Sequence, residues 1–247
     1  MLQSKFEVSF MRKLLLIVLL GLGVGLVALA QEPVAIVNGE SISRQELDQA
    51  TGLSSLIFTI YQQFPRFAQT LLTTDEGAAL IRRYQHDVLE QLILRRLQVQ
   101  EAESRGLEPD ADTLEAKVQE TMDQILEQNN FTEEELADIL TRQGRTVEGF
   151  RADVAAQVRE QLMIQALQDV VTAAASVSEE EIEGYYEDHP DRFTTDSGEV
   201  KPLAEVHDDI AALLLDQKRS ELWNTWLGQT RAAADVEILL GEEESSG

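Results

Sequence analysis

The sequence predicts a mainly α-helical fold with one small two-stranded sheet that joins the two ends of the chain. Three observations lead to this prediction. A helix-start motif recurs three times, glycine and proline punctuate stretches of helical periodicity, and only two segments have the composition of strands. These two segments are residues 34–37 and residues 235–240, which lie near opposite ends of the sequence.

The first thirty residues have the pattern of a secretory signal peptide. Arg12-Lys13 provides a basic start, an apolar run covers residues 14–29, and Ala28-Leu29-Ala30 matches the small-x-small cleavage pattern. We therefore expect export of the chain and cleavage after Ala30. The competing interpretation is an uncleaved membrane anchor, although the run is short for a span and no basic cluster follows it.

The first strand-like segment, Val34-Ala35-Ile36-Val37, is followed by Asn38-Gly39, the commonest two-residue hairpin turn. A hairpin also needs a second strand of alternating apolar residues, and none is recognisable after the turn. Instead, Ser43 and Glu46 have the spacing of a capping box, which starts a helix. We therefore expect the chain to become helical at residue 43 and the first strand to find its partner elsewhere.

The same helix-start motif occurs at Ser43, Thr132 and Ser178. In each case an apolar residue precedes the hydroxyl, glutamate follows at N3 and an apolar residue at N4. Gly106 and Gly144 suit the left-handed position just after a helix. The predicted helices cover residues 43–63, 75–105, 111–128, 133–143, 147–174, 179–188 and 202–233.

The second strand-like segment is Asp235–Leu240, in which Val236, Ile238 and Leu240 alternate. A lone strand cannot satisfy its backbone groups, so we expect it to pair with residues 34–37. Such a strand can also be exchanged between two copies of a chain, so the sequence allows a homodimer. Residues 241–247 have the composition of a loose acidic tail.

The chain is strongly acidic, with 20 basic and 45 acidic residues and a net charge of −25. Residues 1–30 contain three basic residues and one acidic residue, so their removal leaves 17 basic and 44 acidic residues, a net charge near −27. Such a chain is repelled by phosphates and anionic lipid headgroups, which argues against binding of nucleic acid or a membrane surface. Cysteine is absent, which excludes disulfides and thiolate metal sites.

No motif in the sequence indicates catalysis. His86, His189 and His207 are isolated from one another, and none belongs to a metal-ligand pattern. A P-loop, a nucleophile elbow and a glycine-rich dinucleotide turn are also missing. We therefore expect no catalytic residues, no metal and no cofactor.

The most unusual apolar composition lies in residues 56–67, where four aromatic residues fall within ten positions around Pro65. Two interpretations remain open: a helix end that packs on the core, or an exposed surface that contacts another polypeptide. Residues 122–126 form a second apolar set with the same two interpretations. The candidate polypeptide-binding residues are Phe58, Tyr61, Phe64, Phe67, Leu71, Met122, Ile125 and Leu126.

The order of these segments resembles a known family. VAIVNGESISRQELD, HDVLEQLILRRLQVQEAESRGLEPD and QNNFTEEELADILTRQGRTVEGFRADVAAQVREQLMIQ are similar to the N-terminal chaperone domain of SurA-like proteins, which include the PrsA and PpiD foldases of bacterial envelopes. VSEEEIEGYYEDHPDRF resembles the segment that leads into their parvulin domain, and AEVHDDIAALLLDQKRSELWNTWLGQTRAAADVEI resembles the helix and strand that follow it. The resemblance implies a helical cradle, completed by the C-terminal segment, that holds unfolded envelope proteins without ATP.

One departure from the family pattern matters for the activity. The relatives carry a parvulin prolyl isomerase domain after the segment ending in DRF, whereas here only residues 194–201 separate Phe193 from Pro202. Eight residues are far fewer than the roughly 40 to 50 that a folded domain needs. The predicted organisation is a signal peptide over 1–30, a helical chaperone domain over 31–193, a loop over 194–201, a completing helix and strand over 202–240, and a disordered tail over 241–247.

These observations lead to one principal hypothesis and two alternatives. The principal hypothesis is an exported, ATP-independent holdase that binds unfolded or partly folded envelope or secreted proteins and has no isomerase activity. The first alternative is an envelope assembly scaffold that binds one specific folded partner. The second is a prolyl isomerase of unrecognised type.

Overall fold

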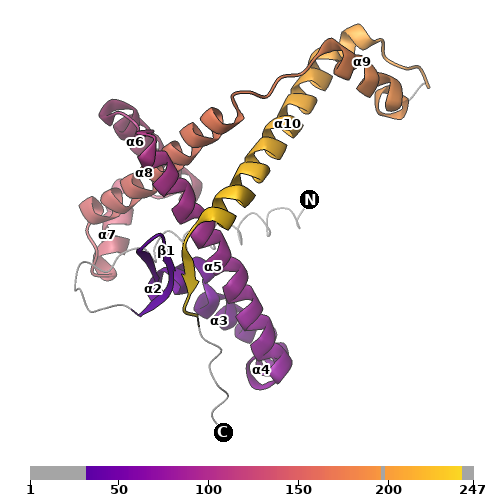
Figure 1. Ribbon diagram of the computed structural model, residues 1–247. Coiled ribbons are helices and arrows are strands. Elements are labelled where there is room, and N and C mark those ends of the chain that lie inside the picture. Colours follow the sequence, from indigo (N-terminus) through magenta and orange to yellow (C-terminus); the bar gives the residue numbers. More distant parts are fainter. Residues whose placement is uncertain (1–31, 196–197, 241–247) are drawn as a thin grey trace. The chain divides into compact units, whose positions relative to one another are not determined.

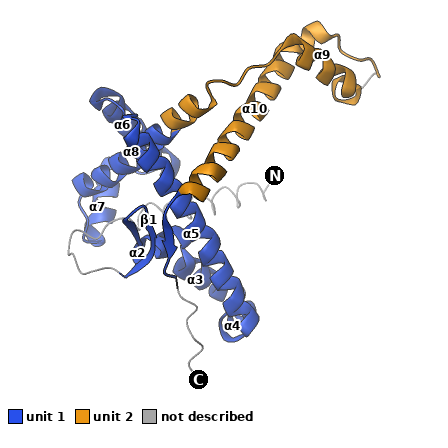
Figure 2. Ribbon diagram, in the orientation of Figure 1, with its two compact units in different colours: residues 1–164, 234–247 blue, residues 165–233 orange. Residues whose placement is uncertain are grey.

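The structure is a computed structural model that describes residues 32–195 and 198–240 (Figure 1). The predicted signal peptide and the predicted C-terminal tail lie outside the described residues. Most described residues are helical, so the predicted mainly α-helical fold is confirmed. The chain divides into two compact units: unit 1 comprises residues 1–164 and 234–247, and unit 2 comprises residues 165–233 (Figure 2).

Unit 1 contains a small antiparallel sheet that joins the two ends of the described chain. Its strands are β1 (Pro33–Val37), β2 (Glu40–Ser43) and β3 (Val236–Ile238), in the order β2-β1-β3. Residues 35–37 of β1 lie opposite residues 236–238 of β3 in antiparallel register. The predicted pairing between the N-terminal and C-terminal segments is therefore confirmed.

The sheet has one strand more than predicted, because the chain does form a hairpin at Asn38-Gly39. Both residues have positive φ, 48° and 87°, as the tight turns that join twisted strands require. The expectation that no second strand follows this turn is wrong. β2 is only four residues long and Ile42 is its only buried apolar residue, so it lacks the alternation by which strands are recognised.

The sheet packs against helices α2 (Arg44–Thr51) and α5 (Asp75–Ser104) to form the first hydrophobic core of unit 1. The fully buried side chains of this core are Val34, Ala35, Val37, Ile42, Leu47, Leu89, Ile93 and Leu97. At its edge, Arg96 pairs with Glu40 at 3.1 Å and with Glu46 at 2.9 Å. Partly exposed ion pairs contribute little, so burial of apolar area provides most of the stabilisation.

The region predicted as one helix over residues 43–63 contains two helices, α2 and α3 (Leu53–Gln63). Between them Gly52 adopts the left-handed conformation, with φ 55°, which ends α2. Glycine is tolerated inside helices at a cost of about 1 kcal/mol, so the sequence did not reveal this break. The capping box at Ser43, which starts α2, is formed as predicted.

Unit 1 also contains α6 (Ala111–Asn129), α7 (Glu133–Arg142) and most of α8 (Val147–Thr172). The last turns of α8 belong to unit 2. Gly106 and Gly144 have positive φ at the preceding helix ends, as predicted. The three helices surround a second core, whose buried side chains are Val118, Met122, Ile125, Leu136, Leu140, Phe150, Val154 and Val158.

Unit 2 is built mainly from α9 (Glu179–Asp188), the short 3-10 helix η1 (Pro190–Phe193) and α10 (Leu203–Ala233). Its buried core is Ile182, Val206 and Ile210. The connection between η1 and α10 closes on itself, since Thr194 and Val200 form an antiparallel bridge. Nine residues, 194–202, separate η1 from α10 at the place where the family resemblance implies a further domain.

Two ion pairs attach α9 to α10, and they respond to pH in opposite directions. A hydrogen bond from Lys218, assisted by the Ser178 backbone, lowers the pKa of Glu181 from 4.5 to about 2. Hydrogen bonds to Glu179 at 2.8 Å and to Asp208 at 3.1 Å raise the pKa of His207 above 6.5. The Glu181 interaction is therefore lost as the pH falls below 4.5, and the His207 interaction is lost as the pH rises through its folded pKa.

We expect the amides of α9 to be best protected from hydrogen exchange between pH 4.5 and 6.5, after correction for intrinsic exchange rates. The change in protection should be small, because both ion pairs are partly exposed to solvent. In a His207→Gln variant the loss of protection above pH 6.5 should disappear while the acid limb remains. Unchanged behaviour above pH 6.5 in that variant would contradict the assignment to His207.

Candidate functional site

Helix α3 and the following helix α4 (Pro65–Thr73) present aromatic side chains to solvent. Phe58, Tyr61, Phe64 and Phe67 are each between 56% and 64% exposed. Large aromatic side chains are usually buried, so four exposed rings within ten residues are the most unusual surface feature of unit 1. Of the two interpretations of residues 56–67, packing on the core does not describe these four rings.

Three leucines near these rings in the sequence are also exposed. Leu56 on α3, Leu72 on α4 and Leu80 on α5 are 43%, 51% and 58% exposed. We call the set Leu56, Phe58, Tyr61, Phe64, Phe67 and Leu72 the α3–α4 surface. All its members lie within residues 56–72, which belong to unit 1.

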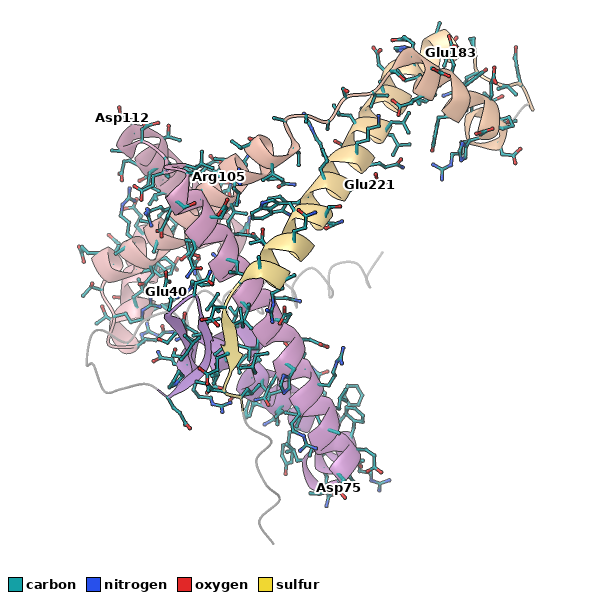
Figure 3. The ribbon with its side chains drawn as sticks, viewed as in Figure 1. Glu40, Asp75, Arg105, Asp112, Glu183 and Glu221 are labelled. Carbon is teal, nitrogen blue, oxygen red and sulfur yellow. The ribbon has the colours of Figure 1, made fainter. Side chains whose placement is uncertain are left out.

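Contacts with α5 flank the segment that carries the α3–α4 surface, one after α4 and one before α3. Thr74 ends α4 and caps α5, accepting a hydrogen bond from the Gly77 backbone at 3.1 Å, and the labelled Asp75 marks this end of α5 in Figure 3. On α4, Ala68 is fully buried. Before α3, the Tyr84 hydroxyl of α5 donates to the carbonyl oxygen of Thr51, the last residue of α2, at 2.9 Å. The segment that carries the exposed rings is therefore attached to unit 1 before and after, although α3 itself has no buried residue.

The threonine hydroxyls of α3 and α4 form hydrogen bonds within their own helices. The hydroxyl of Thr59 donates to the Ser55 carbonyl at 2.9 Å, and that of Thr73 donates to the Gln69 carbonyl at 2.8 Å. Such bonds occupy the hydroxyl donors within their own helices. What this surface offers to a partner is mainly aromatic and aliphatic area.

Of two adjacent leucines on α4, the predicted candidate is the less exposed one. The candidate Leu71 is half-buried, whereas Leu72 is more than half exposed. Two adjacent leucines look alike in a sequence until the inward face of the helix is known. Ala68 lies three residues before Leu71, and this spacing could have identified Leu71 as the inward-facing member.

The second candidate set is mostly part of the core. Met122 and Ile125 are each only 7% exposed and pack with Leu136 and Leu140 of α7. They offer little area to a partner, because they belong to the core that α6 shares with α7 and α8. Leu126 is partly buried and lines a shallow surface hollow together with Phe131. Of the two open interpretations, core packing therefore describes Met122 and Ile125.

Two of the three histidines, His189 and His207, have local structural partners in unit 2. His189 contacts the Tyr185 carbonyl at 2.9 Å and stacks on the Tyr185 ring, and His207 pairs with Glu179. Within residues 32–195 and 198–240, no three acidic or histidine side chains are grouped so as to hold a metal ion. In the same part of the chain, no helix combines the length and the apolar character needed to cross a membrane.

Comparison with known proteins places this arrangement in a family. A family profile described as the SurA-like N-terminal domain matches residues 4–168, about two thirds of the chain. The chain belongs to the SurA-like N-terminal domain family. The resemblance inferred from the order of the sequence segments is therefore confirmed.

Curated relatives of this SurA-like chain include foldases and chaperones. It is 28% identical to the foldase protein PrsA of Clostridium kluyveri over 168 residues, which are 68% of this chain and 48% of the relative. It is 32% identical to the chaperone SurA of Burkholderia lata over 158 residues, which are 64% of this chain and 30% of the relative. The chain thus matches about half of PrsA and less than a third of SurA.

A solved structure also aligns with the SurA-like chain. It comes from a study of PEB4 and Cj1289, described as SurA-like chaperones of Campylobacter jejuni. The alignment has a TM-score of 0.49 and 12% sequence identity, and it covers 85% of this chain and 99% of the other.

Proposed function

We propose that this SurA-like chain is an exported, ATP-independent holdase that binds unfolded or partly folded polypeptides on the α3–α4 surface. The observation that carries the proposal is the exposure of four aromatic rings within ten residues of unit 1. Unfolded chains expose apolar side chains, and burying these against the rings removes apolar area from water. Membership of a family with curated members named chaperone and foldase supports the same proposal.

The proposal excludes prolyl isomerisation as an activity of this chain. Its support is the eight-residue connection between Phe193 and Pro202, closed by a hydrogen bond from the Lys201 N–H to the Phe193 carbonyl at 2.9 Å. This connection leaves no room for a catalytic domain. A proline-peptide isomerisation assay should therefore give the uncatalysed rate, and a rate clearly above it would contradict this part of the proposal.

The proposed location is outside the cytoplasm. Its support is the leader, in which a basic pair precedes an apolar run and a small-residue cleavage pattern at Ala28–Ala30. The absence of a P-loop from the sequence fits a binding cycle that does not use nucleotide hydrolysis. A client released without nucleotide hydrolysis must be bound with modest affinity, and we expect dissociation constants of about 1 μM, or about −8 kcal/mol.

The test is suppression of aggregation of an unfolded client by purified protein. In a Phe58→Ser, Phe64→Ser, Phe67→Ser variant we expect client affinity to fall at least about tenfold. The variant loses three aromatic rings, and a few large side chains usually provide most of the binding energy of an interface. The melting temperature should stay close to that of the parent chain, since exposed rings contribute little to folding.

The matched control replaces exposed aliphatic residues of unit 2 by Val170→Ser, Val200→Ser and Leu213→Ser. This variant should bind clients like the parent chain. Absence of suppression by the parent chain at several-fold molar excess would refute the holdase proposal. Capture of a single stoichiometric folded partner, in place of a range of unfolded clients, would favour the scaffold alternative.

A further inference from the structure

Charge is distributed unevenly between the α3–α4 surface and the remainder of the chain. Helices α3 and α4 together contain one charged residue, Arg66, and no acidic residue. The whole chain has 45 acidic residues against 20 basic ones. Helices α6 and α7 alone carry nine acidic residues, five and four respectively, and two basic ones. An aromatic surface with one basic and no acidic residue among its helices therefore belongs to a strongly negative molecule.

Many of the carboxylates are not neutralised by neighbouring cations. On α7, Glu133, Glu134 and Asp138 are exposed, and among the described residues none of them forms an ion pair. The labelled Asp112 at the start of α6 adds a further exposed carboxylate (Figure 3). Exposed carboxylates without a paired cation contribute fully to the long-range field of a protein.

This charge distribution discriminates between the occupants that an apolar surface could accept. A second copy of the chain has the same negative charge and is repelled at long range. A membrane with anionic headgroups is repelled for the same reason. An unfolded polypeptide with a net positive charge is attracted, and it also exposes apolar side chains for the α3–α4 rings.

We infer that the clients of this chain are cationic unfolded polypeptides, which the acidic surface attracts and the α3–α4 surface retains. The inference rests on the proposed holdase function and specifies its substrate class. Attraction between opposite charges raises the rate of encounter, whereas burial of apolar area at the rings slows dissociation. The two steps should therefore respond to different changes in the protein and the solvent.

The test compares two forms of one client. Reduced lysozyme with its thiols blocked by iodoacetamide is a permanently unfolded basic polypeptide, and succinylation converts its lysine ammonium groups into carboxylates. At about 0.01 M salt, the unmodified form should associate at least about tenfold faster than the succinylated form. Raising the salt to about 1 M should remove most of this difference, because the screening length falls to about 3 Å.

Two variants separate the two steps. Glu133→Gln, Glu134→Gln, Asp138→Asn should slow association of the basic client at low salt and leave its dissociation rate unchanged. Phe58→Ser, Phe64→Ser, Phe67→Ser should accelerate dissociation at least about tenfold with little change in association. All substituted side chains are exposed, so both variants should fold, which circular dichroism and thermal unfolding can verify.

The possible outcomes distinguish this inference from the proposed function. If both client forms bind equally well at every salt concentration, the inference is wrong and the holdase proposal stands. If neither form binds, the holdase proposal itself fails. Unchanged dissociation in the phenylalanine variant would indicate purely ionic adsorption, and phenylalanine-dependent dimers or binding to anionic vesicles would identify a different occupant. Unchanged dissociation, dimers or vesicle binding would each overturn the inference as well.

Discussion

Deletion of residues 235–240 should lower the free energy of unfolding of unit 1 by about 5 kcal/mol, measured by urea denaturation. The deletion removes β3 and uncovers one edge of the central strand β1. Besides the strand ladder, it breaks the bonds from the Asn38 N–H to the Asp235 carbonyl and from the Leu239 N–H to the Val34 carbonyl, both 2.8 Å long. Each lost bond should cost about 1 kcal/mol.

Loss of apolar packing adds to this effect. Val236 and Leu240 are partly buried against the first core of unit 1, and removing them exposes neighbouring apolar area to water. Because domains are stable by only about 5–15 kcal/mol, the deletion removes a large fraction of the total. For a chain of this size the melting temperature should fall by about 10–20 °C.

The control for this deletion is Glu237→Ala. The Glu237 side chain is exposed, and its substitution leaves the backbone bonds between β1 and β3 in place. This variant should unfold within about 0.5 kcal/mol of the parent chain. If the deletion variant melts at the parent temperature, the pairing of the two chain ends does not contribute to stability.

The success and failure of the sequence-based predictions follow the range of the interactions involved. The capping boxes at Ser43, Thr132 and Ser178 were predictable because each is completed within four residues. The pairing of β1 with β3 was predictable by elimination, because two strands were recognised and each needed a partner. β2 was missed because Ile42 gives a single inward residue, and one residue has no period.

The candidate binding residues were only partly predictable, again because local sequence does not show which helices pack together. An apolar residue has the same appearance in a sequence whether or not another helix covers it. The rings of α3 and α4 are exposed, whereas Met122 and Ile125 of α6 are buried in a core that includes side chains of α7 and α8. That packing depends on the turn at Asn130, whose left-handed conformation redirects the chain after α6. Which apolar side chains are exposed therefore depends on how the helices pack in the tertiary structure.

Gly77→Ala should destabilise unit 1 by about 2 kcal/mol or more, although alanine is the better helix former by about 1 kcal/mol. Gly77 lies in the first turn of α5, where the helix passes close to the end of α4. A Cβ atom on residue 77 would lie 2.1 Å from the carbonyl oxygen of Leu71 and 2.6 Å from its carbonyl carbon. These are backbone atoms, which cannot rotate away as a flexible side chain could, so α4 must move.

Gly184→Ala is the matched control, because Gly184 also lies within a helix, α9, and a Cβ there would meet no atom within 4 Å. This substitution should stabilise its helix by about 0.5–1 kcal/mol and leave client binding unchanged. In the Gly77→Ala variant, client affinity should fall together with stability, because α4 carries Phe67 and Leu72. If both substitutions stabilise the protein to the same extent, α4 and α5 are not in close contact. If Gly77→Ala destabilises unit 1 but leaves client affinity unchanged, the binding surface does not depend on the position of α4.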